Sequence, residues 1–219
     1  MSELLCAYTK NADNWWLQPA KGTTENRLLL LQAGSAELSA YKKLGWDAKS
    51  LVLAPGLALD NDKDVIYMKD LSASWPLSDW DYHSVICNHG FSDLWERTPD
   101  FCIDCVQGLA EGGTLNVRLN NPRYFLNLIL KTSREYITMP NSLTMADTTL
   151  RLKRLIQHLE FLGFDLQNKE LEIDESIKNT MLKGGFQHRD LDVLFYFSNF
   201  ADNLEVLYIK NYRLTFVKD

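Results

Sequence analysis

The sequence lacks any long hydrophobic run. No apolar stretch in its 219 residues approaches the roughly 20 residues that a helix needs to cross a bilayer. Its start, MSELLCAYTKNADNWW, also lacks the basic and then apolar order of a secretory signal. We therefore expect a cytoplasmic protein without a membrane span.

Concentrated positive charge is lacking as well. The formal net charge is −6, and the basic residues are scattered except for RLKR at 151–154. Binding nucleic acid of any sequence requires a concentrated positive surface, and so does binding an anionic membrane. We therefore expect neither of these partners. A small-molecule or glycan substrate, a protein partner and a homo-oligomer are all compatible with this composition.

Cysteine is scarce, and the chain contains only Cys6, Cys87, Cys102 and Cys105. The last two form a CxxC pair, but this pair lies inside a predicted helix, and no second pair stands at the spacing of a zinc site. A thioredoxin-type motif would place the pair at a helix start after a strand. We therefore expect reduced, structural cysteines and no metal site.

Apolar strands that alternate with helices make up most of the chain. Strands are predicted at 28–32, 50–54, 65–70, 81–89 and 114–119. Helices are predicted at 36–46, around 92–111 and at 148–164. Gly112 and Gly113 are expected to end the second helix and Gly163 the third. Two long β-rich runs follow at 191–200 and 204–219.

This order of elements predicts a single Rossmann-like α/β domain. Strands that alternate with helices give right-handed crossovers and a mostly parallel sheet. The last two strands are separated only by Ala-Asp-Asn, which allows only an antiparallel hairpin. We expect residues 1–25 to form an N-terminal extension and residues 120–147 a lid or insert.

Two segments resemble the class I S-adenosylmethionine-dependent methyltransferases. KDLSASWPLSDWDYHSVICNH is similar to their segment from an acidic adenine-binding position, through a Leu-Pro-like pair, to strand four. LAEGGTLNVRLNNPRYFLNLIL is similar to their Leu-x-x-Gly-Gly turn before strand five. The Asn-x-Arg-aromatic motif at 121–124 and the apolar helix after it, together with TTLRL and FLGF, resemble methyltransferases of bacterial surface-polysaccharide biosynthesis. The resemblance covers about residues 26–219 and implies a seven-stranded sheet with an antiparallel last strand.

The stretch LLLLQAGSAEL departs from that family's cofactor loop. The family's acidic residue corresponds to Leu30, its first glycine to Gln32 and its last glycine to Ala36, so only Gly34 is kept. Leucine accepts no hydrogen bond, and alanine carries a steric cost where φ is positive. Ala54 stands near the family's second acidic residue, which binds the ribose hydroxyls.

Two functional hypotheses remain open at this point. The chain transfers a methyl group from S-adenosylmethionine to a sugar or polysaccharide hydroxyl, or it is a non-catalytic methyltransferase-like module that serves as a partner or scaffold subunit. A charged acceptor bond contributes roughly 1.5–3 kcal/mol. Losing two of them weakens cofactor binding by on the order of 10²–10⁴, unless other groups replace them.

The candidate site residues follow the strands, where α/β sheets bind ligands. They are Gly34, Asp70, Asn88, His89, Asn121 and Arg123. Gly34, Asn88 and Asp70 are expected to bind the cofactor, and the resemblance places Asp70 at the adenine amino group. The alternative for Asp70 is a helix cap or turn.

Two of these residues are expected to be catalytic. His89 is predicted as a general base because imidazole titrates near neutral pH, and its alternative is a loop histidine with a structural hydrogen bond. Asn121 and Arg123 are predicted to orient a polar substrate, since arginine offers a planar fork of donors. The alternative is that Asn-Pro only forms a turn.

Overall fold

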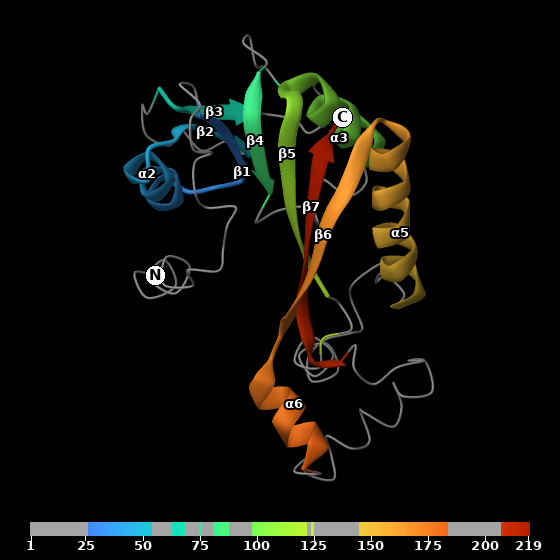
Figure 1. The fold of residues 1–219 in the computed structure, drawn as a ribbon. Helices are drawn as coiled ribbons and strands as arrows, with labels where there is room; N and C mark the ends of the chain where they lie inside the picture. Colours follow the sequence, from blue (N-terminus) through green and yellow to red (C-terminus); the bar gives the residue numbers. More distant parts are fainter. Residues whose placement is uncertain are drawn as a thin grey trace. The chain divides into compact units, whose positions relative to one another are not determined.

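A computed structural model of the chain gives the fold shown in Figure 1. The structure describes residues 26–53, 63–68, 75, 81–87, 98–121, 124, 145–183 and 207–219. Within these ranges the strands are β1 Arg27–Leu31, β2 Asp47–Leu53, β3 Val65–Met68, β4 Tyr82–Cys87, β5 Leu109–Asn120, β6 Phe164–Ile173 and β7 Ile209–Lys218. The helices are α2 Ser35–Lys43, α3 Thr98–Gly108, α5 Met145–Phe161 and α6 Glu175–Leu182.

The seven strands form one sheet in the order β3-β2-β1-β4-β5-β7-β6. The first five strands are parallel: β1 pairs with β2 and β4, β3 pairs with β2, and β5 pairs with β4. This confirms the predicted parallel part of the sheet. Because parallel strands point the same way, their carboxyl ends share one edge, which we call the carboxyl edge.

The last strand is antiparallel to its neighbours, as predicted. The Asn121 N–H, just after β5, donates to the Lys210 carbonyl near the start of β7 at 3.0 Å. The Asp219 N–H, just after β7, donates to the Gly163 carbonyl just before β6 at 2.9 Å. Both hydrogen bonds join the end of one strand to the start of its neighbour. The seven-stranded mixed sheet therefore matches the predicted Rossmann-like methyltransferase fold.

The predicted neighbour of this last strand was wrong. We expected residues 191–199 beside it, but in the described sheet β7 lies between β5 and β6. β6 is an edge strand, and its sequence FDLQNKELEI has only Phe164 fully buried. Such an edge strand needs no apolar run, so it is not recognised from hydrophobicity. Residues 191–200 lie outside the described residues.

The glycine pair was also misassigned, because it lies inside β5 instead of ending a helix. α3 ends at Gly108. Tyr82 pairs with Leu109 and Ser84 pairs with Thr114, so β4 advances by two residues where β5 advances by five. Gly112 has a φ of +70° within this bulge, and a Cβ at Gly113 would lie 2.7 Å from the Ala110 carbonyl oxygen. Both positions need glycine because of the bulge.

Two predicted helices are confirmed. In α2, Leu38 and Tyr41 are buried and belong to an apolar cluster with Leu28, Leu30 and Ile86 of the sheet. In α5, Leu155 and Leu159 are fully buried four residues apart, as the spacing of its apolar residues predicts. Gly163 follows this helix with a φ of +86°, which agrees with its predicted role as a helix stop.

Contacts between residues divide the chain into two compact units. Unit 1 consists of Met1–Arg118, His158–Gln167 and Leu214–Asp219, and unit 2 consists of Leu119–Gln157 and Asn168–Arg213. A buried polar network in unit 1 joins three strands. Thr215 Oγ1 donates to Asn116 Oδ1 at 2.9 Å, and the Asn116 amide lies 3.3 Å from Ser84 Oγ.

Unit 2 contains α6, and the side chain of Asp174 caps the start of this helix. The Ile177 N–H donates to Asp174 Oδ1 at 3.0 Å, and the Tyr124 hydroxyl donates to Asp174 Oδ2 at 2.5 Å. The hydrogen bond from Tyr124 is the main cause of a lowered pKa of Asp174.

The predicted lid at 120–147 lies mostly outside the described residues, and the single-domain assignment stays a prediction.

Within the described residues, no helix combines the length and the apolar character needed to cross a membrane.

Candidate functional site

The carboxyl edge of unit 1 is where α2 begins. Figure 1 shows β1 leading into this helix, and only three residues separate Leu31, the last residue of β1, from Ser35, the first of α2. Backbone N–H groups at a helix N-terminus have no partner within the helix and carry partial positive charge. The three residues Gln32 to Gly34, here called the β1–α2 loop, place these N–H groups at the edge where parallel sheets bind ligands.

Gln32 has a left-handed backbone conformation, with a φ of 58°. Its N–H donates to the Leu51 carbonyl of β2 at 2.8 Å, which fixes the turn after β1. Gln32 corresponds to the first glycine of the cofactor loop in the methyltransferase family that the sequence resembles. The chain therefore has a left-handed turn at this position without a glycine. We expected the strain at Ala36, and this was wrong because Ala36 lies within α2.

A buried serine supports the same loop from β2. Ser50 is fully buried, and its Oγ donates to the Ala33 carbonyl at 2.8 Å. Ser50 was not predicted as a site residue. The feature of the sequence that indicates Ser50 is a polar residue at the start of the apolar run SLVL. A hydroxyl buried among strands needs a hydrogen-bond partner.

Gly34 is exposed at the start of α2. It is the N-cap residue, with φ −75° and ψ 166°, and no side chain caps the helix. A Cβ built on Gly34 meets no heavy atom of the described residues within 4 Å. The predicted cofactor-binding position therefore lies at the carboxyl edge, and neither its φ nor nearby packing requires glycine. No side chain at Gly34 covers the first N–H groups of α2.

Leu30 contributes no polar group to the loop. Its side chain is fully buried, and it belongs to the apolar cluster beneath α2 with Leu38 and Tyr41. The position that carries a carboxylate in the resembling family is therefore part of the hydrophobic core. Ala54, the second replaced position, lies outside the described residues.

Cys87 ends β4 at the same edge and is buried. Burial raises the pKa of its thiol to about 12, with a smaller contribution from the negative charge of Glu37. Burial likewise raises the pKa values of Cys102 and Cys105. All three cysteines are free and buried, as expected of structural thiols, and their reduced state stays a prediction. Cys6 lies outside the described residues.

The other predicted site residues are only partly tested by the structure. Asp70, Asn88, His89 and Arg123 lie outside the described residues, so their roles stay predictions. Asn121 is buried, and its side-chain amide donates to the Ile209 carbonyl at 2.7 Å. The structure therefore gives Asn121 a role in joining β5 to β7.

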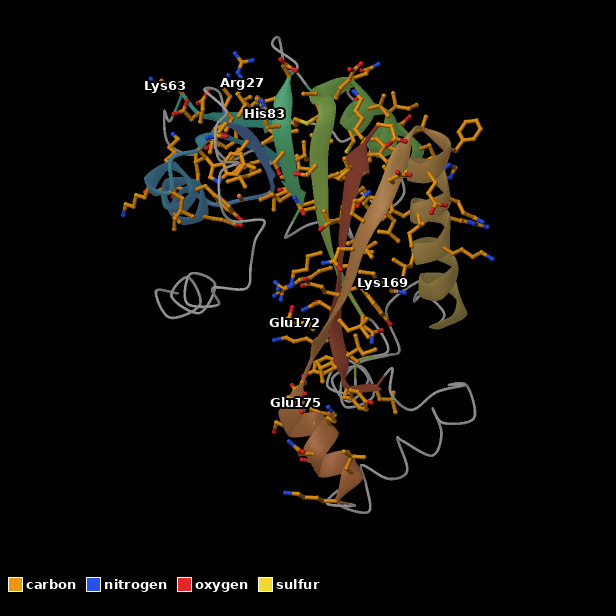
Figure 2. All side chains as sticks on the ribbon, viewed as in Figure 1. Arg27, Lys63, His83, Lys169, Glu172 and Glu175 are labelled. Atoms are coloured by element: carbon orange, nitrogen blue, oxygen red, sulfur yellow. The ribbon has the colours of Figure 1, made fainter. Side chains whose placement is uncertain are left out.

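Basic side chains lie at the opposite edge of the sheet. Figure 2 shows Arg27, Lys63 and His83 near the amino ends of β1, β3 and β4. The Arg27 N–H donates to His83 Nδ1 at 3.4 Å. Within the described ranges, no group of three or more His, Cys, Asp or Glu side chains is arranged to hold a metal ion.

Comparisons with known proteins give the fold. No protein-family model matches the chain, and curated proteins give no significant match. A solved S-adenosylmethionine-dependent methyltransferase from Archaeoglobus fulgidus is 17% identical with a TM-score of 0.63, over 100% of this chain and 95% of its own. The chain has a methyltransferase fold.

Two further solved structures support this fold. A proposed S-adenosylmethionine-dependent methyltransferase from Listeria monocytogenes is 11% identical with a TM-score of 0.52, over 89% of this chain and 92% of its own. The MccD protein is 16% identical with a TM-score of 0.51, over 89% of this chain and 90% of its own. Function lies in a site and not in a fold, so these likenesses establish architecture alone.

Proposed function

We propose that the chain binds S-adenosylmethionine at the carboxyl edge and transfers its methyl group to a hydroxyl of a sugar or polysaccharide. The observation that supports this most is the β1–α2 loop: a left-handed turn at Gln32 followed by an exposed Gly34 at the start of α2. In this proposal the loop backbone holds the methionine end of the cofactor. The acceptor class rests on the resemblance of residues 121–130, 148–152 and 161–164 to methyltransferases of surface-polysaccharide biosynthesis.

The loop is held rigid before any ligand arrives. The hydrogen bond from Gln32 to Leu51 and the one from Ser50 to Ala33 fix its backbone on β2. Its function in this proposal is to present the N–H groups at the start of α2 to the carboxylate of the methionine part, as helix N-termini present N–H groups to other anions.

The bound cofactor supplies an activated methyl group, and the chain supplies alignment. Methyl transfer in one displacement depends more on holding donor and acceptor in line than on acid-base help. In this proposal Asp70 binds the adenine amino group and Asn88 the cofactor, His89 accepts the proton of the acceptor hydroxyl, and Arg123 orients the acceptor.

Replacing Gly34 with asparagine tests this proposal. An asparagine at the N-cap accepts hydrogen bonds from the second or third N–H of a helix, and its side chain would cover the N–H groups that we assign to the ligand. We expect the free energy of unfolding to rise by about 0.5–1 kcal/mol, because α2 gains a cap and the unfolded chain loses a glycine.

The same substitution should weaken the binding of S-adenosylhomocysteine by about tenfold or more. Calorimetric titration and thermal unfolding measure the two effects separately. The control variant is Ser39→Asn, an exposed position in the next turn of α2, for which we expect wild-type affinity. If Gly34→Asn binds S-adenosylhomocysteine as tightly as wild type, the ligand does not lie on this loop.

Leu30 favours a second candidate function. Because its side chain belongs to the hydrophobic core, the chain lacks one charged group that binds the cofactor in the resembling family. A non-catalytic module that acts as a partner or scaffold subunit requires no such group. This candidate predicts no heat of binding with about 1 mM S-adenosylhomocysteine, which corresponds to less than about 4 kcal/mol of binding free energy.

A further inference from the structure

Glu37 is the acidic residue of the first turn of α2. It comes seven positions after Leu30 in the sequence, at the same edge of the sheet. Its side chain is half-buried, whereas Gly34, Ser35 and Ala36 before it are exposed. A half-buried carboxylate next to an exposed loop is placed to meet a ligand that lies on the loop.

The geometry of the helix directs this carboxylate toward the carboxyl edge. Glu37 is four residues before Tyr41, which is buried against the sheet, and residues four apart share one face of a helix. The Cα–Cβ bonds of a helix tilt toward its N-terminus. The Cα–Cβ bond of a residue in the first turn on the sheet-facing side therefore tilts toward the β1–α2 loop.

Cys87 shows where the charge of Glu37 acts. Cys87 is the last residue of β4, the strand next to β1. The charge of Glu37 contributes to the raised pKa of the Cys87 thiol. The carboxylate is therefore close enough to the end of β4 to act there electrostatically. Leu30 pairs with Ile86, the residue before Cys87, so the position that lacks its carboxylate also lies near the end of β4.

We propose that Glu37 takes the place of the missing carboxylate and binds the α-ammonium group of the methionine part of the cofactor. The carboxylate comes from α2 instead of from β1, which leaves Leu30 free to serve the core. Opposite charges in a partly buried site attract more strongly than in water. This inference rests on the proposed function and assigns a residue to the same site.

A pair of ligands separates this role from the rest of the site. S-adenosylhomocysteine carries the α-ammonium group, and 5′-methylthioadenosine has the same nucleoside and sulfur without the amino acid. In calorimetric titrations of the full chain, Glu37→Gln should weaken S-adenosylhomocysteine binding by about 10- to 100-fold. Binding of 5′-methylthioadenosine should be unchanged by the same variant.

Helix stabilisation is the competing explanation for Glu37, because an acidic residue in a first turn interacts favourably with the helix dipole. Lys43→Gln is the matched control, since it removes a favourable charge from the last turn of the same helix. Both variants should lower the melting temperature by about 1–4 °C, and only Glu37→Gln should change affinity for S-adenosylhomocysteine.

Two results would overturn the inference. One is wild-type affinity of Glu37→Gln for S-adenosylhomocysteine, which would leave the proposed function intact. The other is an equal loss of affinity for both ligands, because a purely structural role would affect both. If wild-type protein itself does not bind S-adenosylhomocysteine, the proposed function fails first.

Discussion

Replacing Gln32 separates the conformation of the β1–α2 loop from the side chain that it carries. The residue has a φ of 58°, a conformation that costs a non-glycine residue about 1–2 kcal/mol. Gln32→Ala removes the side chain and keeps this cost. Gln32→Gly removes both the side chain and the cost, but it adds about 0.5–1 kcal/mol of conformational entropy to the unfolded chain.

The difference between the two variants isolates the backbone term, because both lose the same side-chain interactions. We expect Gln32→Gly to be more stable than Gln32→Ala by about 0.5–1 kcal/mol. For a chain of this length, that corresponds to a melting temperature about 1–4 °C higher. Urea unfolding and calorimetry of both variants measure it. If the alanine variant is as stable as the glycine variant, the left-handed turn is not present in solution.

Two further predictions concern polar groups away from the loop. Thr215→Val should lower the free energy of unfolding by about 1–3 kcal/mol, because Asn116 Oδ1 is buried and loses its donor. Thr180→Val, which removes an exposed hydrogen bond within α6, should lower it far less. Equal losses in urea unfolding would refute this. Asp174 has a pKa below its ordinary value of 3.8, mainly because of Tyr124, so its contribution to stability is present above the unfolded-state pKa and is lost as the pH falls through the folded-state pKa. The stability difference between wild type and Tyr124→Phe should therefore shrink between about pH 5 and pH 2, and a constant difference would show that Tyr124 does not act through the carboxylate.

Elements with strong periodicity were predictable from the sequence. The leucine run before Gln32 gives β1, because consecutive residues of this strand are buried. The spacing of Leu155 and Leu159 gives α5, because one face of this helix is buried. β6 was missed because nearly all residues of this edge strand are exposed or half-exposed and it has no apolar run. The role of Gly112 and Gly113 was missed because a bulge and a helix stop both require glycine, so composition cannot separate them.

The candidate site was predictable only as a location. Because parallel strands end at one edge, the sequence placed Gly34 correctly at the carboxyl edge. The backbone conformation of Gln32 could not be read from its identity, since glutamine seldom adopts a left-handed turn. Glu37 was not singled out because its sequence position is ordinary for a first helical turn. Its significance comes from the fold, which brings α2 to the end of β4.

The affinity for S-adenosylhomocysteine tests the central claim most directly. The loop geometry and the carboxylate of Glu37 predict binding, and Ala54 in place of the second acidic residue of the family that the sequence resembles predicts that it is weak. Calorimetric titration of the purified chain should give a Kd between about 1 μM and 1 mM, or roughly 8 to 4 kcal/mol of binding free energy. No binding at about 1 mM would contradict the proposed cofactor site. A Kd well below about 1 μM would contradict the argument that the loss of the second carboxylate costs affinity.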